Sequence, residues 1–279
     1  MSLVYYILLI IGVPFIIYFE RRLLGVLQLR LGLFIYALNS FFIFIADFLK
    51  IISKYQVYIF SYNFVLLYIF CLIFTILSVI SLFTISFNFS SNGYFYFQLI
   101  LLIILCFIPF FFSIFIYFSN SIFSYIGNLR SVFLLLSYEL SLNFSLIIIL
   151  YESYSFFLYF HVYNLWILIL VISILVLCFM SDSSRVPFDL IEGESELVSG
   201  FNTELALSLF LLIFFGEYML LYVFIIFFSY LNSSLILSLF IFIYVRGLLV
   251  RYFFLHLIKL FWYNFLFILN WLFLFILIS

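Results

Sequence analysis

The sequence has few charged residues, and this scarcity decides the class of protein. Charged residues make up only 8% of the 279 positions, and hydrophobic residues make up 70%. A soluble domain carries about 25% charged residues, so a chain this apolar could not cover its surface in water. In lipid every backbone polar group must be hydrogen-bonded within the protein, which leaves helices or a closed barrel.

The short alternating segments that a barrel requires are also missing. The apolar residues instead form unbroken runs of about 17 to 25 residues, the length that a helix needs to cross roughly 30 Å of hydrocarbon. Glycine (9) and proline (3) are scarce, whereas phenylalanine (46) and tyrosine (23) are abundant. This bias toward AT-rich codons suggests an AT-rich genome, as in many organelles. We expect an all-α integral membrane protein.

Cysteine and histidine are too few and too scattered to form a redox centre. Cys71, Cys106 and Cys178 each lie inside an apolar run and form no C-x-x-C pair, so the sequence supports neither a disulfide framework nor an iron–sulfur site. His161 and His256 are predicted on opposite membrane faces, so they cannot bracket one haem. The sequence contains no Walker loop or dinucleotide-binding glycine motif, no metal-ligand set and no basic patch for nucleic acid. Any redox centre therefore belongs to a partner.

The apolar runs predict eight transmembrane helices within a single membrane domain, residues 1–279. The expected spans are 3–19, 63–87, 95–118, 131–151, 162–180, 204–228, 232–249 and 261–279, with a polar break at Ser229–Ser234. The first run lacks a basic n-region and a cleavage site, so we expect a retained span rather than a signal peptide. No internal repeat is obvious, which disfavours a transporter built from inverted repeats.

The basic residues orient these spans. All of them lie in or beside the odd-numbered connections: Arg21, Arg22, Arg30, Lys50, Lys54, Arg130, Arg185, Arg246, Arg251 and Lys259. With eight spans, every odd connection falls on one side of the membrane, which the positive-inside rule identifies as the inner side. We expect both termini on the outer side and the large loops, 20–62 and 181–203, on the inner side.

The first inner connection is predicted to contain an amphipathic helix over residues 39–54. Ser40, Asp47, Lys50 and Lys54 are spaced so that they form one polar stripe along a helix, while most of the remaining residues are apolar. This pattern is typical of a helix lying at the membrane surface. It could be an ordinary surface anchor, or it could form a wall beside an opening that faces the lipid.

An acidic segment joins the fifth and sixth spans, in the inner loop 181–203. Six of the eleven acidic residues lie in or just after this loop: Asp182, Asp189, Glu192, Glu194, Glu196 and Glu204. Carboxylates packed this closely cannot all ionise without repulsion, which raises some of their pKa values toward neutrality. They would titrate as a coupled group. In a soluble protein the pattern would indicate a charged surface; leading into an apolar span, it suits a proton relay.

Other charged residues lie where charge is costly. Glu139 and Glu217 are each predicted near the middle of a span, where a carboxylate faces the interior and is usually functional. The alternative is a protonated, hydrogen-bonded structural acid. Glu20, Arg21 and Arg30 follow the first span, where cations stabilise the end of a helix. The same cluster could guide a polar headgroup through an apolar wall.

Several segments of the sequence resemble the motifs of a known family. The longest is RVPFDLIEGESELVSGFN at residues 185–202. The shorter ones are ERRLLG at 20–25, QLRLG at 28–32, ADFLK at 46–50, LR at 129–130, SYE at 137–139 and GEY at 216–218. In one order from about residue 20 to residue 265, these segments resemble the quinone-site membrane subunits (chain 1) of respiratory complex I, NADH:ubiquinone oxidoreductase, and the longest is similar to that family's signature nearly residue for residue.

The resemblance implies a place at the joint of the peripheral and membrane arms of the complex. There it implies a tunnel through which ubiquinone, the substrate, enters from the bilayer, lined by Glu20, Arg21, Arg30, Asp47, Arg185, Phe188, Arg246 and Arg251. It implies a proton or charge-coupling path that begins with Asp189, Glu192, Glu194, Glu196, Glu139 and Glu217. The family carries no redox centre of its own.

The resemblance also implies partners and a location. FMN and iron–sulfur clusters would be held by partner subunits, and the direct neighbours would be the peripheral-arm subunits of the quinone pocket, small membrane subunits and lipids. The expected location is the mitochondrial inner membrane, with the large loops in the matrix and the termini on the intermembrane-space side.

The sequence departs from the family pattern in ways that affect the tunnel more than the function. Asp182-Ser183-Ser184 stands where the family usually has Glu-Thr-Asn, so one carboxylate is a methylene shorter. In the last inner loop, Val250, Phe253 and Leu255 replace a proline, an arginine and an aspartate. The contact with the peripheral arm is expected to be remodelled there.

Two other functions remain open from the residues alone. A membrane-bound hydrogenase has a homologous subunit that does not use quinone in the same way, and the long signature favours the respiratory family over it. A stand-alone ion transporter is a different class of protein. Purification separates these possibilities, because only a complex I subunit would co-purify with many subunits, flavin and iron–sulfur clusters.

Overall fold

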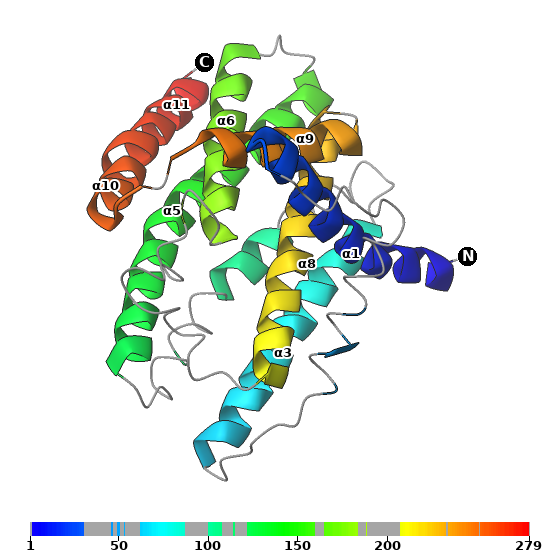
Figure 1. Ribbon diagram of the computed structural model, residues 1–279. Coiled ribbons are helices and arrows are strands. Elements are labelled where there is room, and N and C mark those ends of the chain that lie inside the picture. Colours follow the sequence, from blue (N-terminus) through cyan, green and yellow to red (C-terminus); the bar gives the residue numbers. More distant parts are fainter. Residues whose placement is uncertain are drawn as a thin grey trace. The chain divides into compact units, whose positions relative to one another are not determined.

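The structure is a computed structural model in which every regular element of the described residues is a helix. It describes residues 2–30, 46, 49, 50, 53, 62–86, 100–107, 114, 122–159, 165–183, 188, 207–232, 234–250 and 252–278. The helices are α1 (Ser2–Leu27), α3 (Tyr62–Ser86), α5 (Ile122–Tyr159), α6 (Leu165–Asp182), α8 (Leu207–Asn232), α9 (Leu235–Leu248), α10 (Phe254–Lys259), the π-helix η3 (Leu260–Phe265) and α11 (Leu266–Ile278). Figure 1 shows their order along the chain.

The chain divides into two compact units. The first contains residues 1–86 and 202–249, and the second contains residues 87–201 and 250–279. In the first unit, α3 and α9 pack against α8, and α1 packs against both α8 and α9. Figure 1 shows α3 and α8 running side by side. The expectation of a single membrane domain over residues 1–279 stays a prediction.

The second unit is built around the long helix α5. The α6 helix runs antiparallel to α5, since the contact between Ser141 and Cys178 is followed, toward the start of α5, by a contact between Tyr138 and Asp182. The terminal helix, which comprises α10, η3 and α11, packs along α5 as well, and the Phe144 and Phe273 rings meet edge to face. Thus α5 is the helix on which the second unit is assembled.

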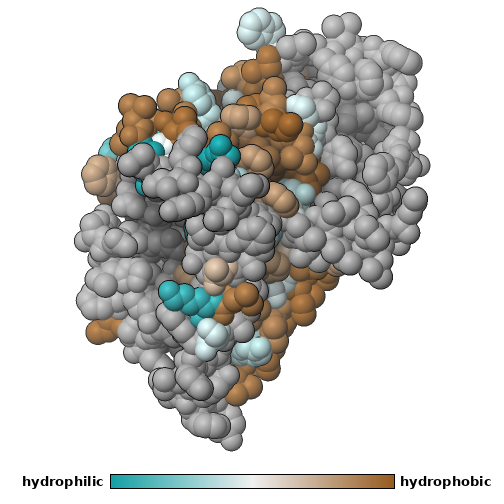
Figure 2. Space-filling view, turned by 45° about the vertical axis from the view of Figure 1, so that its right-hand side comes forward, coloured by the Kyte–Doolittle hydropathy of each residue, from teal (hydrophilic) through white to brown (hydrophobic). Residues whose placement is uncertain are grey.

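The surface of the described helices is strongly apolar, as a lipid-facing surface must be. Large hydrophobic side chains such as Trp166, Ile236 and Phe267 are exposed, and Figure 2 shows extensive hydrophobic surface on the part of the chain that is described. Four helices there are long and apolar enough to cross a membrane, within residues 65–83, 125–149, 209–229 and 254–276. Shorter apolar helices cover 169–182 and 235–248. The all-α membrane class is confirmed, while the count of eight spans stays a prediction.

Several helices extend beyond the boundaries expected from hydropathy. The helix α1 continues through Glu20 to Leu27, α5 runs from Ile122 to Tyr159 instead of 131–151, and the last helical segment begins at Phe254 rather than at 261. Hydropathy measures which residues prefer lipid. A helix can continue into water as long as its backbone amides and carbonyls remain hydrogen-bonded, so its ends need not coincide with the ends of the apolar run. The break expected at Ser229–Ser234 is present, since α8 ends at Asn232 and Ser234 is extended before α9 begins.

Two predicted inner-side features lie largely outside the described residues. Within the expected surface helix 39–54, Ala46, Leu49, Lys50 and Ser53 are described, and all four are helical and exposed. The interfacial helix therefore stays a prediction. Of the acidic loop 181–203, the structure describes only the first three residues and Phe188.

The first helix ends in a tight stop at a leucine. Leu29 has a φ of 51°, in the left-handed region that usually requires glycine. The Arg30 amide donates to the Gly25 carbonyl at 3.0 Å and the Leu29 amide donates to the Val26 carbonyl at 3.2 Å, which is the bonding of a Schellman motif. This stop fixes the direction in which the chain leaves α1 toward Arg30.

Buried hydroxyl groups are satisfied within their own helices. Ser78 and Ser81 of α3 and Ser137, Ser141 and Ser145 of α5 are buried, and each hydroxyl donates to the carbonyl three residues earlier at 2.6–2.8 Å. An unbonded hydroxyl in apolar surroundings would be costly. These serines therefore present small faces along which neighbouring helices can approach closely, as is common between transmembrane helices.

Replacing Gly216 by alanine is expected to disturb the packing of α3 on α8. A Cβ atom on Gly216 would lie 2.5 Å from the nearest atom of the Phe74 ring, which is itself buried. Overpacking of this kind typically costs about 1–3 kcal/mol, so Gly216→Ala should lower the thermal stability of the membrane-extracted protein. The smaller side chain of Phe74→Leu should relieve the clash, so the double variant should be more stable than Gly216→Ala alone. A double variant no better than the glycine variant would contradict this packing.

Candidate functional site

The structure describes seven of the fourteen residues assigned to the tunnel and the coupling path. In the first unit these are Glu20, Arg21, Arg30, Glu217 and Arg246, and in the second unit they are Glu139 and Phe188. The other seven, Asp47, Arg185, Asp189, Glu192, Glu194, Glu196 and Arg251, lie outside the described residues. Two groups of polar contacts, one in each unit, are candidate functional sites and are described separately.

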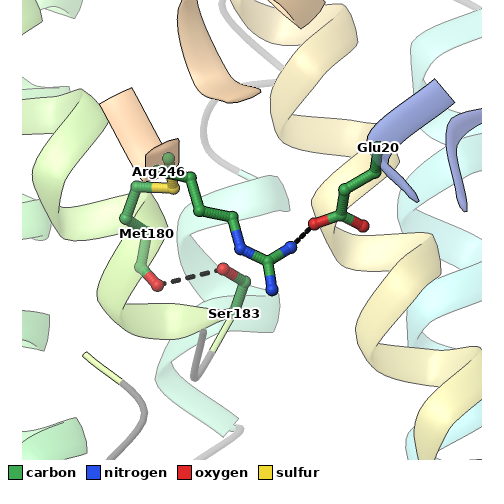
Figure 3. A network of polar contacts seen from close by, with 4 residues as sticks. All are labelled: Glu20, Met180, Ser183 and Arg246. Atoms are coloured by element: carbon green, nitrogen blue, oxygen red, sulfur yellow. Dashed lines mark hydrogen bonds and ion pairs between the residues drawn. The ribbon is translucent and has the colours of Figure 1, made fainter. Parts of the chain in front are cut away.

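In the first unit, Glu20 and Arg246 form an ion pair between the ends of two helices. Glu20 lies in the last two turns of α1 and Arg246 in the last turn of α9, and Figure 3 shows the guanidinium pointing at the carboxylate. The two side chains are only 7% and 19% exposed, respectively. The sequence predicted each residue as a part of the tunnel, but the pairing joins elements more than 200 residues apart.

The approach of α9 to α1 depends on a glycine beside the ion pair. A Cβ atom on Gly247 would lie 2.9 Å from the Leu27 side chain. The absence of a side chain at this position lets the end of α9 lie close to α1, so that Arg246 can reach Glu20. The pair therefore holds the C-terminal ends of α1 and α9 together.

The other arginines of the first helix differ in their surroundings. Arg21 and Arg30 are exposed, and Arg30 follows the left-handed turn at Leu29. Arg22 is partly buried and donates to the Tyr18 hydroxyl at 3.1 Å, one turn earlier. The exposed guanidiniums offer planar sets of donors that can bind a carbonyl or a phosphate.

In the second unit, Tyr138 and Asp182 connect α5 to α6. The Tyr138 hydroxyl donates to an Asp182 carboxylate oxygen at 3.0 Å, and the tyrosine is buried. Asp182 is the last residue of α6 and lies beyond the expected span 162–180. Sequence analysis placed Asp182 in the acidic segment and Tyr138 in a family motif, but it did not identify the pair.

Asp182 is held near the point of ionisation. Burial raises the pKa of its carboxyl group, the hydrogen bond from Tyr138 lowers it and the nearby Glu139 raises it, which together bring the pKa to about 7. A donor to a carboxylate favours the charged form, whereas burial disfavours it. Asp182 can therefore exchange a proton near neutral pH.

Glu139 lies next to Tyr138 on α5, among polar side chains that the sequence did not single out. It is partly buried, and the Cys106 thiol hydrogen-bonds with its carboxylate. Cys106 in turn accepts a hydrogen bond from the Asn143 amide at 3.6 Å. The predicted mid-span carboxylate thus has neighbours from two helical segments. The contact of Cys106 with α5 could not be predicted from the sequence, because packing between distant segments brings it about.

The start of the inner loop is fixed to the end of α6. The Ser183 hydroxyl donates to the Met180 carbonyl at 2.9 Å, as Figure 3 shows, and the Ser183 amide donates to the Phe179 carbonyl at 3.2 Å. These bonds satisfy carbonyls that the end of a helix leaves open. Serine keeps the hydroxyl of the threonine usual in the resembled family, so the departure at Ser183 preserves the cap beside Asp182.

Glu217 and Phe188 take different positions. Glu217 is partly buried on α8, directly after the glycine that contacts Phe74.

Phe188, from the loop after α6, is 3% exposed and its ring stacks on Tyr252 with an interplanar angle of 11°. Phe188 therefore packs into an aromatic cluster of the second unit rather than projecting into solvent.

Comparison with known proteins identifies one family throughout. The family model described as NADH dehydrogenase matches residues 1–277. A protein of the honey bee Apis mellifera ligustica, NADH-ubiquinone oxidoreductase chain 1, is 34% identical over 225 residues, which cover 78% of this chain and 72% of the relative. The protein of the same name from the mosquito Aedes aegypti is 34% identical over 238 residues, with coverage of 78% and 71%. One from Locusta migratoria is 46% identical over 107 residues, with coverage of 36% and 34%.

Removing one partner of the Glu20–Arg246 pair should destabilise the first unit. Breaking a buried ion pair leaves one uncompensated charge and costs about 3–5 kcal/mol, so Arg246→Gln should strongly reduce the amount of protein recovered in the membrane fraction. The exchange of both residues, Glu20→Arg with Arg246→Glu, restores opposite charges and should recover part of the loss. An exchange variant as poor as the single variant would indicate that Arg246 acts through other contacts.

Proposed function

The chain belongs to the NADH dehydrogenase family, and we propose that this membrane subunit of NADH-ubiquinone oxidoreductase forms the tunnel for ubiquinone and begins the proton-coupling path. The enzyme is an oxidoreductase of the respiratory chain, and the chain contributes apolar helices to its membrane part. We place it in the mitochondrial inner membrane, with the loops 20–62 and 181–203 on the matrix side, as the charge distribution predicts.

The observation that carries the coupling proposal is the hydrogen bond between Tyr138 and Asp182. It joins α5, which bears Glu139, to the residue that opens the acidic loop. Asp182 exchanges a proton near neutral pH because burial and the tyrosine donor act on it in opposite directions. A path that starts with Asp189, Glu192, Glu194 and Glu196 would then pass through Asp182 and Tyr138 to Glu139.

The tunnel proposal is supported by the charged ends of α1 and α9. The ion pair of Glu20 with Arg246 joins the ends of these two helices. Arg21 and Arg30 are exposed at the same end of α1. A quinone headgroup carries carbonyl oxygens that accept hydrogen bonds, and an arginine presents several donors in one plane. Asp47, Arg185, Phe188 and Arg251 complete the proposed tunnel.

The proposed division of labour assigns electron transfer to partners. FMN and iron–sulfur clusters in the peripheral arm would deliver electrons to ubiquinone, and this chain would hold the headgroup and receive the resulting change of charge. Its carboxylates would pass protons or charge to neighbouring membrane subunits. The chain's own residues then determine how ubiquinone binds and how its reduction is coupled to protons.

Substitution of Arg30 by methionine should impair the use of quinone while leaving the complex assembled. Methionine keeps much of the side-chain length but removes every donor, so reduction of ubiquinone by NADH should fall several-fold. Oxidation of NADH by a hydrophilic artificial acceptor, which bypasses the tunnel, should be unchanged. Lys259→Met, at an exposed cation of α10, serves as the control. A parallel loss of both activities would assign Arg30 a structural role instead.

Substitution of Glu139 by glutamine should separate assembly from coupling. Glutamine keeps the shape of the side chain but cannot ionise, so the complex should assemble while quinone-linked turnover and proton pumping decrease. Both are measured in sealed membrane vesicles with NADH and a short-chain quinone. Glu152→Gln, at the other acidic residue of the same helix, is the matched control. Wild-type turnover and pumping in Glu139→Gln would place the path elsewhere.

A further inference from the structure

The terminal helix of the second unit contains a π-helical turn, η3, between α10 and α11. In a π turn each backbone amide bonds to the carbonyl five residues earlier, so the turn takes up more chain than an α turn. Such turns are rare and occur frequently at functional sites. The buried residue of η3 is Phe261, which is 0% exposed.

The π turn determines the face of the helix on which Phe261 lies. Phe261 and Leu269 are both fully buried, eight residues apart. In an unbroken α-helix their side chains would point in directions about 80° apart. The extra residue of the π turn brings them to within about 20° of each other. Ile276, seven residues after Leu269, continues the same buried row. An α turn here would therefore rotate Phe261 away from its present contacts.

Those contacts join an inner-loop residue to α5. The Phe261 ring centroid lies 6.1 Å from that of Phe188 and 6.0 Å from that of Tyr138. Phe188 also stacks on Tyr252, with centroids 6.0 Å apart. Phe188 directly precedes Asp189, which is assigned to the coupling path. Tyr252 directly follows Arg251, which is assigned to the tunnel. Phe261 is thus the ring that lies between this part of the loop and the helix carrying Glu139.

The hydroxyl at the far end of the Tyr138 ring connects this residue to α6. Its hydroxyl donates to Asp182 at 3.0 Å, while its ring packs against Phe261. A buried tyrosine has two rotatable side-chain angles, and packing on the ring decides where the hydroxyl points. The titratable groups that act on Tyr138 are Asp182 and Cys178 from α6 and Glu139 from α5.

We propose that Phe261 is a positioning residue that keeps the Tyr138 hydroxyl on the Asp182 carboxylate, and that it links the position of Phe188 to this hydrogen bond. The proposal rests on the proposed function, because it gives Asp182 and Tyr138 a part in the coupling path. A movement of Phe188 that accompanies quinone binding would be transmitted through the Phe261 ring. The π turn supplies the helix geometry that places the ring there.

A double-mutant cycle in the intact complex tests the proposal. Tyr138→Phe removes the donor to Asp182, so Asp182 should stay protonated to a higher pH and the pH profile of quinone-linked turnover should shift upward. Loss of one hydrogen bond should lower turnover by about two- to ten-fold. Phe261→Leu should shift the profile in the same direction, and the double variant should behave like Tyr138→Phe alone.

Two further variants keep the result interpretable. Phe273→Leu removes another aromatic contact between the terminal helix and α5, far along from Tyr138, and should leave the pH profile unchanged. Phe261→Met is measured in parallel, since its flexible side chain can fill the space left by the ring if Phe261→Leu does not assemble. NADH oxidation by an artificial acceptor gives the amount of assembled enzyme in each sample.

The outcomes separate this inference from the proposed function. If Tyr138→Phe shifts the profile but Phe261→Leu does not, or if their effects add, the positioning role of Phe261 is wrong while the coupling path stands. If Tyr138→Phe leaves the profile unchanged, the path through Asp182 falls and the positioning role falls with it. Loss of assembly in both Phe261 variants would show that the ring is structural and would overturn the proposal.

Discussion

The need to satisfy polar groups without water governs this molecule. With only 8% charged residues, the chain can place a hydroxyl, a carboxylate or a guanidinium in its interior only beside a partner, because an unpaired polar group in apolar surroundings is costly. The buried serines of α3 and α5 bond to their own helices, and Glu20 bonds to Arg246. These buried polar groups therefore each have a specific contact, and the contacts between helices mark the candidate functional residues.

Most of the chemistry lies at the ends of helices. Glu20, Arg246 and Asp182 all lie in the last turns of their helices, where the backbone leaves carbonyls that need donors and where water or a headgroup can approach. Glu139 is different, since it lies in the interior of α5 and depends on side chains such as Cys106 for its contacts. The carboxylates at the helix ends are thus held by groups from a second helix, whereas Glu139 is held by side chains within the apolar part of the second unit.

The sequence was sufficient for the parts that depend on local composition. The apolar runs located the described helices, and the polar residues after Ser229 located the break between α8 and α9. The residues that the motifs assign to the tunnel and the coupling path stay a prediction. Hydropathy could not locate the ends of α1, α5 or the terminal helix, because these helices continue after the residues stop being apolar.

The pairings and the π turn could not be predicted for a different reason. Glu20 and Arg246, like Tyr138 and Asp182, are brought together by packing between distant segments, and no spacing in the sequence encodes their distance. The turn at Leu260–Phe265 has no sequence signature of its own, since its residues suit an α-helix equally well. Its geometry follows from keeping both Phe261 and Leu269 buried, which is a property of the surrounding helices.

The same turn affects how this chain should be compared with its relatives. A π turn accommodates one additional residue within the helix, so that the buried residues before and after the turn still lie on the same face. A relative that lacks this residue can keep the same buried row with a plain α-helix, so an alignment should place a single gap within residues 260–265 rather than in the loop before Phe254. With the gap in that loop, the residues before the turn would be compared one place out of step, and Phe261 would be matched to a position on another face of the helix.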